Sequence, residues 1–318
     1  MYASPIMDWV FLGLLVPAVL VPIVLLCGFA GCRQILGLED PILTVAPPTN
    51  LRADSIGLDG ITLAWDYLDP PPEPVKFDVE INNTSPPLQS IVSDISGRSF
   101  THSGLPPGTT FFYRVRAVRT SDHLASDWVP DPPLLVTTLI FETAFETTTN
   151  PANPAAGAAV AGACVVQRIP GSALSRGGSL VRITLTGLAN QETRLDFVSI
   201  SQSLPTTSPQ PWDAADLPVP VPFGGVAMVS LQNGTSAVSD IVQYPVTQGQ
   251  DLIIAFDVDP ASQNVLRRTV VGAEAYLRNN TAQAAAQDRA PGYATINNVV
   301  YCIERIEVAG PEPPGPIT

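Results

Sequence analysis

The sequence has few charged residues, and positive charge is the scarcer kind. Its 318 residues include 16 lysines and arginines against 29 aspartates and glutamates, which gives a formal net charge of −13. Lys76 is the one lysine. Proteins that bind phosphate backbones or anionic headgroups need clusters of lysine and arginine. The sequence therefore predicts no nucleic-acid partner.

Histidine is almost absent, which bears on catalysis. The two histidines, His102 and His123, fall in segments that we expect to be exposed loops, and none follows residue 123. A Ser-His-Asp or Cys-His site needs a histidine to transfer the proton. The sequence also lacks a Gly-x-Ser-x-Gly nucleophile motif and a phosphate-binding glycine loop. We predict that the protein is not an enzyme and has no catalytic residues.

The cysteines are few and do not form a metal-binding pattern. They are Cys27, Cys32, Cys164 and Cys302, with no Cys-x-x-Cys spacing and with both histidines far away. This arrangement predicts no zinc site. Cys164 and Cys302 fall in strand-like segments near the two ends of the second half of the chain. Two interpretations stay open for this pair: a disulfide, which an oxidising compartment permits, or two buried thiols in a β core.

One long apolar run lies near the start of the chain. Trp9–Ala30 contains 22 residues without a charge. At ~1.5 Å per residue a helix of this length spans ~33 Å, which is enough to cross a bilayer. A buried core helix is the alternative, but no other segment offers a helical partner. The sequence therefore predicts a membrane anchor or lipoprotein-type signal in residues 1–33, followed by a tether in residues 34–46.

The end of this run, Phe29-Ala30-Gly31-Cys32, resembles the lipobox of bacterial lipoproteins. The resemblance implies that Cys32 is lipidated and becomes the mature N-terminus. Two features depart from the pattern: Phe29 stands where leucine is usual, and Met1–Asp8 has no lysine or arginine, whereas secretory signals begin with a basic segment. A retained helix and a lipidated Cys32 both stay open. Either one tethers the chain to a membrane, with the rest at the cell surface.

Proline and glycine are abundant, with 33 and 23 residues, which suits turn-rich β-sheet domains. The clearest strand follows the turn at Gly104–Gly108. There Phe111, Tyr113 and Val115 alternate with polar or exposed residues, the period-2 pattern of a half-buried strand. We therefore predict an all-β protein.

Several motifs around this strand resemble the fibronectin type III family. Ile61–Asp66 carries the expected core tryptophan, Trp65, and Lys76–Asn82 alternates with its polar side outward. Leu134–Thr138 resembles the closing strand. The resemblance covers about residues 45–139, and it implies a β-sandwich domain at residues 47–139. The sequence contains no Arg-Gly-Asp tripeptide, so integrin-type adhesion has no support.

The second half of the chain shows short strands separated by turns. Residues 140–162 are expected to be a linker that contains one edge strand, and residues 309–318 a proline-rich tail. Roughly eight strands within residues 163–308, without a convincing helix, favour a jelly-roll-like β-sandwich. This half loosely resembles sandwich domains of bacterial surface, tail-fibre and esterase-associated proteins. The predicted fold class is all-β: two β-sandwich domains after one N-terminal transmembrane or signal helix.

The best candidate for a ligand-binding site is the long loop Ser203–Pro222. It carries Trp212, Asp213 and Asp216 among prolines that stiffen the backbone and lower the cost of ordering it. A tryptophan flanked by carboxylates can stack on a sugar ring and accept its hydroxyl groups. In the alternative interpretation, Trp212 folds back and caps the edge of the sandwich.

A second, weaker candidate is a pair of carboxylates on one strand. Asp257 and Asp259 are two residues apart and therefore project from one face, which we expect to be exposed to solvent. Several oxygen ligands can hold Ca²⁺, so the pair is a candidate calcium site. Ordinary surface charges are the alternative. No other cofactor is expected.

These patterns together predict a membrane-tethered, extracytoplasmic binding or adhesion protein. The fibronectin-like domain serves as a spacer, and the distal sandwich binds a glycan or a surface protein. The alternative is a structural subunit of an envelope, appendage or tail-like assembly. A third interpretation is an accessory domain of a hydrolase system.

Phe111 gives a testable prediction, because it occupies the place of the corner tyrosine in the fibronectin-like pattern. Phenylalanine cannot donate the hydroxyl hydrogen bond that ties this corner to the backbone. We expect Phe111→Tyr to raise the free energy of unfolding of this domain by about 0.5–1.5 kcal/mol. Thermal or urea unfolding measures the change, and an unchanged or lower midpoint contradicts the prediction.

Overall fold

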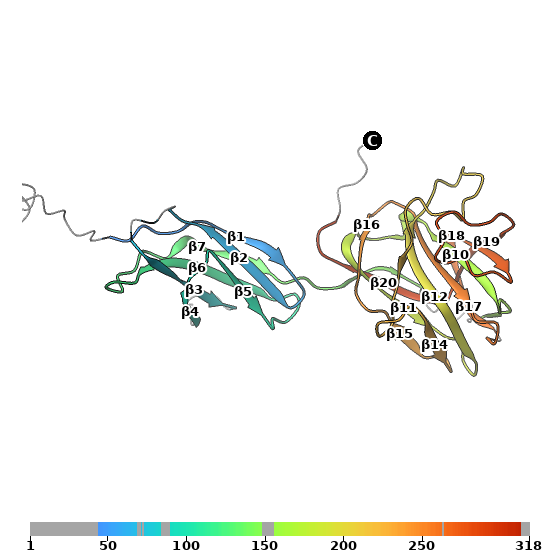
Figure 1. Cartoon of the computed structure of the whole chain (residues 1–318). Helices are drawn as coiled ribbons and strands as arrows, with labels where there is room; N and C mark the ends of the chain where they lie inside the picture. Colours follow the sequence, from blue (N-terminus) through green and yellow to red (C-terminus); the bar gives the residue numbers. More distant parts are fainter. Residues whose placement is uncertain are drawn as a thin grey trace, which may run out of the picture. The chain divides into compact units, whose positions relative to one another are not determined.

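The computed structural model describes residues 44–68, 71, 73–83, 90–147, 156–262 and 264–312. Within these ranges every regular element is a β-strand except one 3₁₀ turn at Gly171–Ala173 (Figure 1). Among the same residues, no helix has the length and apolar character that crossing a bilayer requires. The expected anchor at residues 1–33, with Cys32, lies outside the described residues. So do nearly all of the tether and residues 313–318 of the tail.

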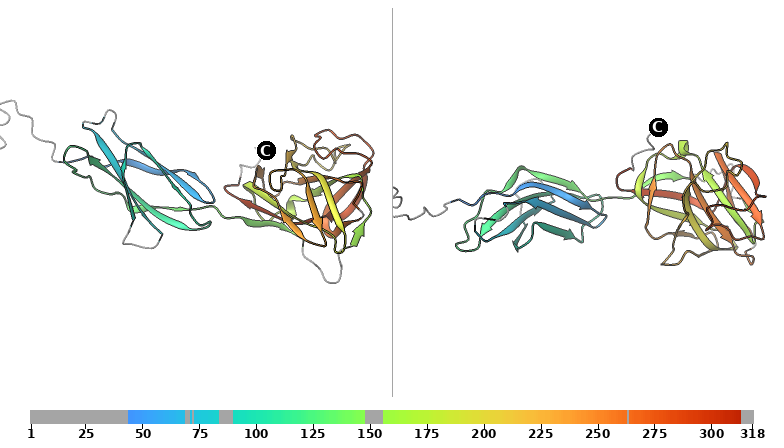
Figure 2. Two further views of the ribbon diagram at one scale, coloured as in Figure 1. Left: turned by 60° about the horizontal axis from the view of Figure 1, so that its bottom comes forward. Right: turned by 45° about the horizontal axis from the view of Figure 1, so that its top comes forward.

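The chain divides into two compact units, with all of the first before Thr137 and most of the second from Thr137 onward. The first domain is a sandwich of a three-stranded sheet, in the order β1-β2-β5, and a four-stranded sheet, in the order β4-β3-β6-β7. Figure 2 shows both domains from two further directions. The strands of the first domain are β1 (Thr49–Ile56), β2 (Gly60–Asp66), β3 (Val75–Asn82), β4 (Ser90–Ile95), β5 (Ser99–Ser103), β6 (Thr110–Arg119) and β7 (Val129–Thr137).

The core of the first domain is built as the alternation predicts. Ile61, Leu63 and Trp65 of β2 are almost fully buried, with Trp65 2% exposed. The indole of Trp65 packs edge-on against the ring of Phe77 on β3, with centroids 5.4 Å apart. The tryptophan thus joins one sheet to the other across the sandwich, which is the contribution of a large aromatic ring to a small core.

The polar face of β3 differs from the prediction. Asp78 and Glu80 were expected to face solvent, yet both are buried, at 6% and 7% exposure. The neighbouring strand β6 covers them with arginines: Arg116 Nη2 lies 2.8 Å from Asp78 Oδ2, and Arg114 Nη2 lies 2.6 Å from Glu80 Oε2. Buried carboxylates need such partners. The sheet therefore carries a layer of paired charges where the sequence predicted open surface.

The corner at Phe111 receives its hydrogen bond from another residue. The Phe111 ring is 6% exposed and therefore packs in the core. The Thr138 hydroxyl donates to the carbonyl oxygen of Pro106, at 2.7 Å, and accepts from the backbone N–H of Thr109, at 2.9 Å. Thr138, which is 2% exposed, thus ties the turn before β6 to the end of the domain.

The second domain consists of two antiparallel sheets that enclose one core. The larger sheet has the order β13-β12-β17-β10-β18-β19, with β14 also on β12 and β9 also on β18. The smaller has the order β15-β11-β20-β8, with β16 also on β11. The strands are β8 (Glu142–Glu146), β9 (Ala156–Ala158), β10 (Ala163–Ile169), β11 (Gly178–Thr186), β12 (Glu192–Gln202), β13 (Val219–Pro220), β14 (Val229–Gln232), β15 (Ser236–Val238), β16 (Val242–Val246), β17 (Leu252–Val258), β18 (Val265–Asn279), β19 (Ala294–Tyr301) and β20 (Ile303–Ala309).

The segment expected to be a linker contributes two strands to this domain, β8 and β9, and β9 pairs with β18. β8 pairs with β20, with Phe145 opposite Ile306. Ala144 and Phe145 are buried in the main core, which also holds the inward residues of β10, β11 and β17. The second sandwich therefore begins before residue 163, because the smaller sheet needs β8 to cover one edge of β20.

The central strands of the larger sheet are buried on both faces. On β17, Leu252, Ile254 and Phe256 point into the main core, while Ile253 and Ala255 belong to a second cluster on the opposite face. We call this second group, namely Cys164, Val166, Ile253, Ala255, Tyr276, Ala284 and Tyr293 with Phe197 and Trp212 packed against it, the outer cluster. A strand that is apolar on both sides requires cover on both sides.

The role of Thr138 leads to a stability prediction. Thr138→Val should lower the free energy of unfolding of the first domain by about 1–3 kcal/mol, because the change leaves the part-buried Thr109 N–H without its partner. Chemical denaturation followed by the fluorescence of the core tryptophan measures the loss. Thr138→Ser keeps the hydroxyl and serves as the control. Equal stability of the two variants would contradict the assigned role.

Candidate functional site

Trp212, the centre of the predicted binding loop, packs against the outer cluster. Its ring stacks on that of Tyr293, with centroids 5.4 Å apart and an interplanar angle of 26°, and meets Tyr276 edge-on at 6.1 Å. The indole is half-buried. Trp212 thus folds back onto the sandwich, which is the alternative to a ligand-binding role in the sequence analysis.

Asp213 is buried rather than free to meet a ligand. It is 7% exposed, and its Oδ1 accepts the backbone N–H of Arg289 at 2.7 Å. Burial raises the pKa of this carboxyl above its ordinary value, while the hydrogen bond from Arg289 opposes the shift. Sequence reasoning missed Arg289, because nothing local shows that its side chain, 2% exposed, closes over the loop.

Asp216 is likewise engaged inside the domain. Its Oδ1 accepts the backbone N–H of Gln202 at 2.7 Å, and its Oδ2 accepts the hydroxyl of Tyr244 at 2.8 Å. The three predicted binding residues therefore anchor the loop to β12, β16 and the loop after β18.

The cysteine pair follows the interpretation of two buried thiols. Cys164 and Cys302 are both free, so the structure contains no disulfide between them. Cys164 lies in the outer cluster, whereas Cys302 lies in the main core. Burial raises the pKa of each thiol to about 12, and the nearby carboxylate of Asp257 adds to the shift at Cys164.

The predicted calcium pair is arranged differently from the expectation. Asp257 is 8% exposed, and its Oδ1 accepts the backbone N–H groups of Gln283 and Ala284 at 2.9 and 3.1 Å. Asp259 Oδ1 accepts the N–H of Ala261 at 2.6 Å. The expected solvent-exposed face is therefore wrong for Asp257. Among the described residues, no three or more His, Cys, Asp or Glu side chains are grouped to hold a metal ion.

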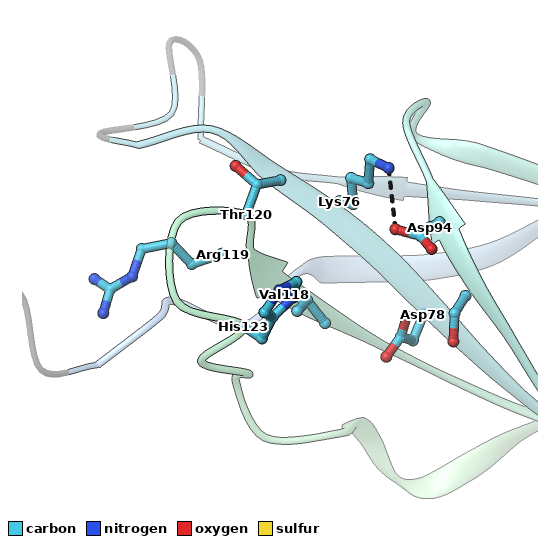
Figure 3. A pocket seen from close by; sticks show the side chains of 8 residues that line it. Lys76, Asp78, Asp94, Val118, Arg119, Thr120 and His123 are labelled. Carbon is cyan, nitrogen blue, oxygen red and sulfur yellow. Dashed lines mark hydrogen bonds and ion pairs between the residues drawn. The ribbon is translucent and has the colours of Figure 1, made fainter.

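The first domain carries a hollow of about 360 Å³ over β3, β4 and β6 (Figure 3). Lys76 and Asp94 form one wall and are paired at 3.0 Å, and Val118 and His123 lie opposite them. Asp78 also lines it but is bound to Arg116. The charges of these groups are neutralised in pairs, so the hollow presents no converging set of free charges to a ligand.

The histidine expected in an exposed loop, His102, lies in β5 instead. It is half-buried, and its Nδ1 lies 2.9 Å from the hydroxyl of Tyr113. Burial lowers the pKa of this imidazole. Tyr113 itself is fully buried, so the pair is part of the sandwich interior. His123 is exposed, as expected.

The surface feature that sequence reasoning missed is a group of exposed apolar side chains. Of the six exposed large apolar residues described after residue 140, four lie on the neighbouring segments 226–228 and 238–241, at the β14–β15 side of the second domain. Asp240 joins these segments, because its carboxylate accepts the N–H of Gly225 at 2.7 Å and its own N–H donates to Pro222 at 2.8 Å. We call the four residues the edge patch: Val226 (53% exposed), Met228 (51%), Val238 (53%) and Ile241 (52%).

The engagement of Asp257 gives a testable prediction about calcium. Asp257→Ala should lower the free energy of unfolding of the second domain by about 1.5–3 kcal/mol, because buried N–H groups lose an ionised acceptor. We expect millimolar Ca²⁺ to change the melting temperature of neither the wild-type protein nor the variant. A Ca²⁺-dependent rise in the wild type that Asp257→Ala abolishes would show a calcium site instead.

Comparison with known proteins identifies a family for the first domain. The model of the fibronectin type III domain matches residues 46–129. The match ends where β7 begins, and β7 completes the four-stranded sheet. A search of curated proteins gave no match.

Solved structures resemble the chain only distantly. A segment of two fibronectin type III domains from chicken tenascin is 10% identical, with a TM-score of 0.25, and the alignment covers 79% of this chain and 99% of that one. The FN1–FN3 domains of chicken CNTN1 are 10% identical, with a TM-score of 0.29 and coverage of 85% and 74%. The chitinase ChiA74 from Bacillus thuringiensis is 9% identical, with a TM-score of 0.25, and the alignment covers 76% of this chain but only 30% of the chitinase. Similarities at these scores carry no argument. The family assignment depends instead on the matched family model and on the strand order. The first domain of this chain is a fibronectin type III domain.

Proposed function

We propose that this chain is a non-catalytic, membrane-tethered, extracytoplasmic binding protein whose fibronectin type III domain is a spacer. Domains of this family typically serve as adhesion or spacer modules. The apolar run Trp9–Ala30 supports the tether, because its length and lack of charge suit a bilayer. The position of His102 supports the absence of catalysis, since that imidazole is held by Tyr113 inside the sandwich.

The second domain supports the role of a distal binding module. Eight of its strands form two sets of four, in the orders β8-β20-β11-β16 and β10-β17-β12-β14. This is the double Greek-key order of a jelly roll. The hairpin β18–β19 extends the second sheet beyond β10, because β18 pairs with β10. Such a domain presents its loops and edge strands on a rigid framework, and binding residues commonly lie on loops held in this way.

The edge patch is the observation that carries the proposal. Isolated exposed apolar residues are ordinary on protein surfaces, but a contiguous group marks a site of interaction. Val226 and Met228 are two residues apart on one segment, and Val238 and Ile241 lie on the next, which the Asp240 contacts bring alongside. β14 and β15 lie side by side in Figure 1. We propose that this patch is the binding surface.

A protein is the partner that this surface fits best. A glycan site needs exposed aromatic rings for stacking. In the described part of the second domain every aromatic ring is buried or half-buried, and Trp212 is stacked on Tyr293. Methionine and branched aliphatic side chains instead suit the apolar centre of a protein interface. The glycan of the sequence-based hypothesis is therefore the weaker choice.

A second copy of the chain is the alternative partner, in which case the protein is a structural subunit. β14 and β15 favour this version, since each ends a path of hydrogen-bonded strands within the described residues. Edge strands next to apolar side chains can pair with another chain. The two versions differ in the identity of the molecule that contacts the patch.

Site-specific photo-crosslinking in producing cells tests the proposal. A photoreactive residue replaces Met228 in the patch, and Val271, which is 85% exposed outside the patch, provides the matched control. We expect crosslinks to a different protein from position 228 and none from position 271. Mass spectrometry of the crosslinked product distinguishes a second copy, which would establish the structural-subunit alternative. Identical patterns at the two positions, or none, would overturn the binding surface.

A further inference from the structure

One turn at the surface of the second domain pairs an asparagine with a glycine. Asn233 and Gly234 lie between β14 and β15, and they are the one Asn-Gly pair in the sequence. Both have the left-handed backbone that such turns require, with φ of 51° and 74°. The N–H of Thr235 donates to the carbonyl oxygen of Gln232 at 2.8 Å and closes the turn, at whose tip Asn233 is exposed.

The two groups that can react with each other in this turn have no hydrogen-bond partner. Within the described ranges, the side-chain amide of Asn233 and the backbone N–H of Gly234 are both unbonded. The contact that holds Asn233 uses its backbone N–H instead, which donates to the carbonyl oxygen of Gln191 at 2.9 Å. A free backbone nitrogen can attack the amide carbon of the residue before it. Glycine favours this attack, because it places no side chain beside the nitrogen and lets the backbone rotate.

We propose that Asn233 is a site of spontaneous deamidation. The Gly234 nitrogen, on losing its proton, bonds to Cγ of Asn233, and the Cγ–Nδ2 bond breaks, so that the amide leaves as ammonia together with that proton. Water then opens the resulting succinimide ring. Opening at Cγ gives aspartate, whereas opening at the backbone carbonyl carbon gives isoaspartate, in which the main chain continues through the side chain. The net reaction consumes water and releases ammonia, and it needs neither an oxidant nor a reductant.

Other asparagines in the described part of the chain share the left-handed backbone, but none is followed by glycine: Asn50, Asn190, Asn280 and Asn298. The side-chain amides of Asn50 and Asn298 are also hydrogen-bonded. Asn190 is the best match to Asn233, because it is exposed and its amide has no partner among the described residues. Gln191 follows it, and Oε1 of Gln191 accepts the N–H of Asn264 at 3.1 Å, so that a held side chain stands beside the nitrogen. Asn190 therefore serves as an internal control.

Isoaspartate changes the turn more than aspartate does. It lengthens the main chain by a methylene group between Gln232 and Thr235, whose hydrogen bond depends on the length of the turn. It also adds a carboxylate at the surface of a protein whose net charge is already −13. The turn joins the two segments of the edge patch, since Met228 precedes it and Val238 follows it. Deamidation of Asn233 therefore alters the exposed surface at this side of the domain.

Ageing of the purified full chain at mildly alkaline pH, followed by peptide mass spectrometry, tests the proposal. We expect Asn233 to be converted at least about tenfold faster than Asn190, because only Asn233 is followed by glycine. Isoaspartate should be among the products, and the rate should rise with pH, since the Gly234 nitrogen must lose its proton. Two variants move the glycine: Gly234→Ala should slow the conversion of Asn233 by about tenfold, and Gln191→Gly should accelerate that of Asn190.

Conversion of Asn233 and Asn190 at equal rates in the wild type would overturn the proposal. Aspartate without isoaspartate would also overturn it, because direct hydrolysis of the amide gives aspartate alone. If Gly234→Ala does not fold, since a φ of 74° strains a residue with a side chain, Gln191→Gly must accelerate Asn190 for the proposal to stand. Hydrogen exchange at Thr235 should be faster in the aged protein, and unchanged exchange would contradict the effect on the turn.

Discussion

The structure of the second domain depends on one constraint, which is that the central strands of its larger sheet are apolar on both faces. β17 sends Leu252, Ile254 and Phe256 into the main core and Ile253 and Ala255 to the other side. One partner sheet covers only one face. Loops cover the other face of this sheet. The residues of these loops are therefore engaged in contacts within the domain.

Loops that cover an apolar face must also satisfy their own backbone polar groups. Asp257 and Arg289 serve this purpose, one as an acceptor for N–H groups and the other as a donor to carbonyl groups. The same layer also occupies Trp212 and its flanking carboxylates. Residues whose types suit ligand binding are thus used for contacts within the domain.

In the fibronectin type III domain, the outer face of a central strand is covered by paired charges instead of loops. The face of β3 turned away from the core carries Asp78 and Glu80, and the arginines of β6 lie directly across from them, as the register pairs Asp78 with Arg116 and Glu80 with Arg114. Arg116 also lies over the ring of Trp128 at 4.5 Å. Such cross-strand pairs stabilise a sheet, and they leave the adjacent hollow with few free charges.

The sequence by itself determined the all-β class, the family of the first domain and the inward residues of its strands, because a period of two is a local property. Ile61, Leu63 and Trp65 show it without reference to any other segment. Only the tertiary structure decided that Asp257 is buried, that Trp212 stacks on Tyr293, and that Cys164 and Cys302 lie in separate clusters. Local alternation states which face a side chain occupies but not what covers that face. The cover comes from segments far away in the chain, as in the hydrogen bond between Arg289 and Trp212, 77 residues apart.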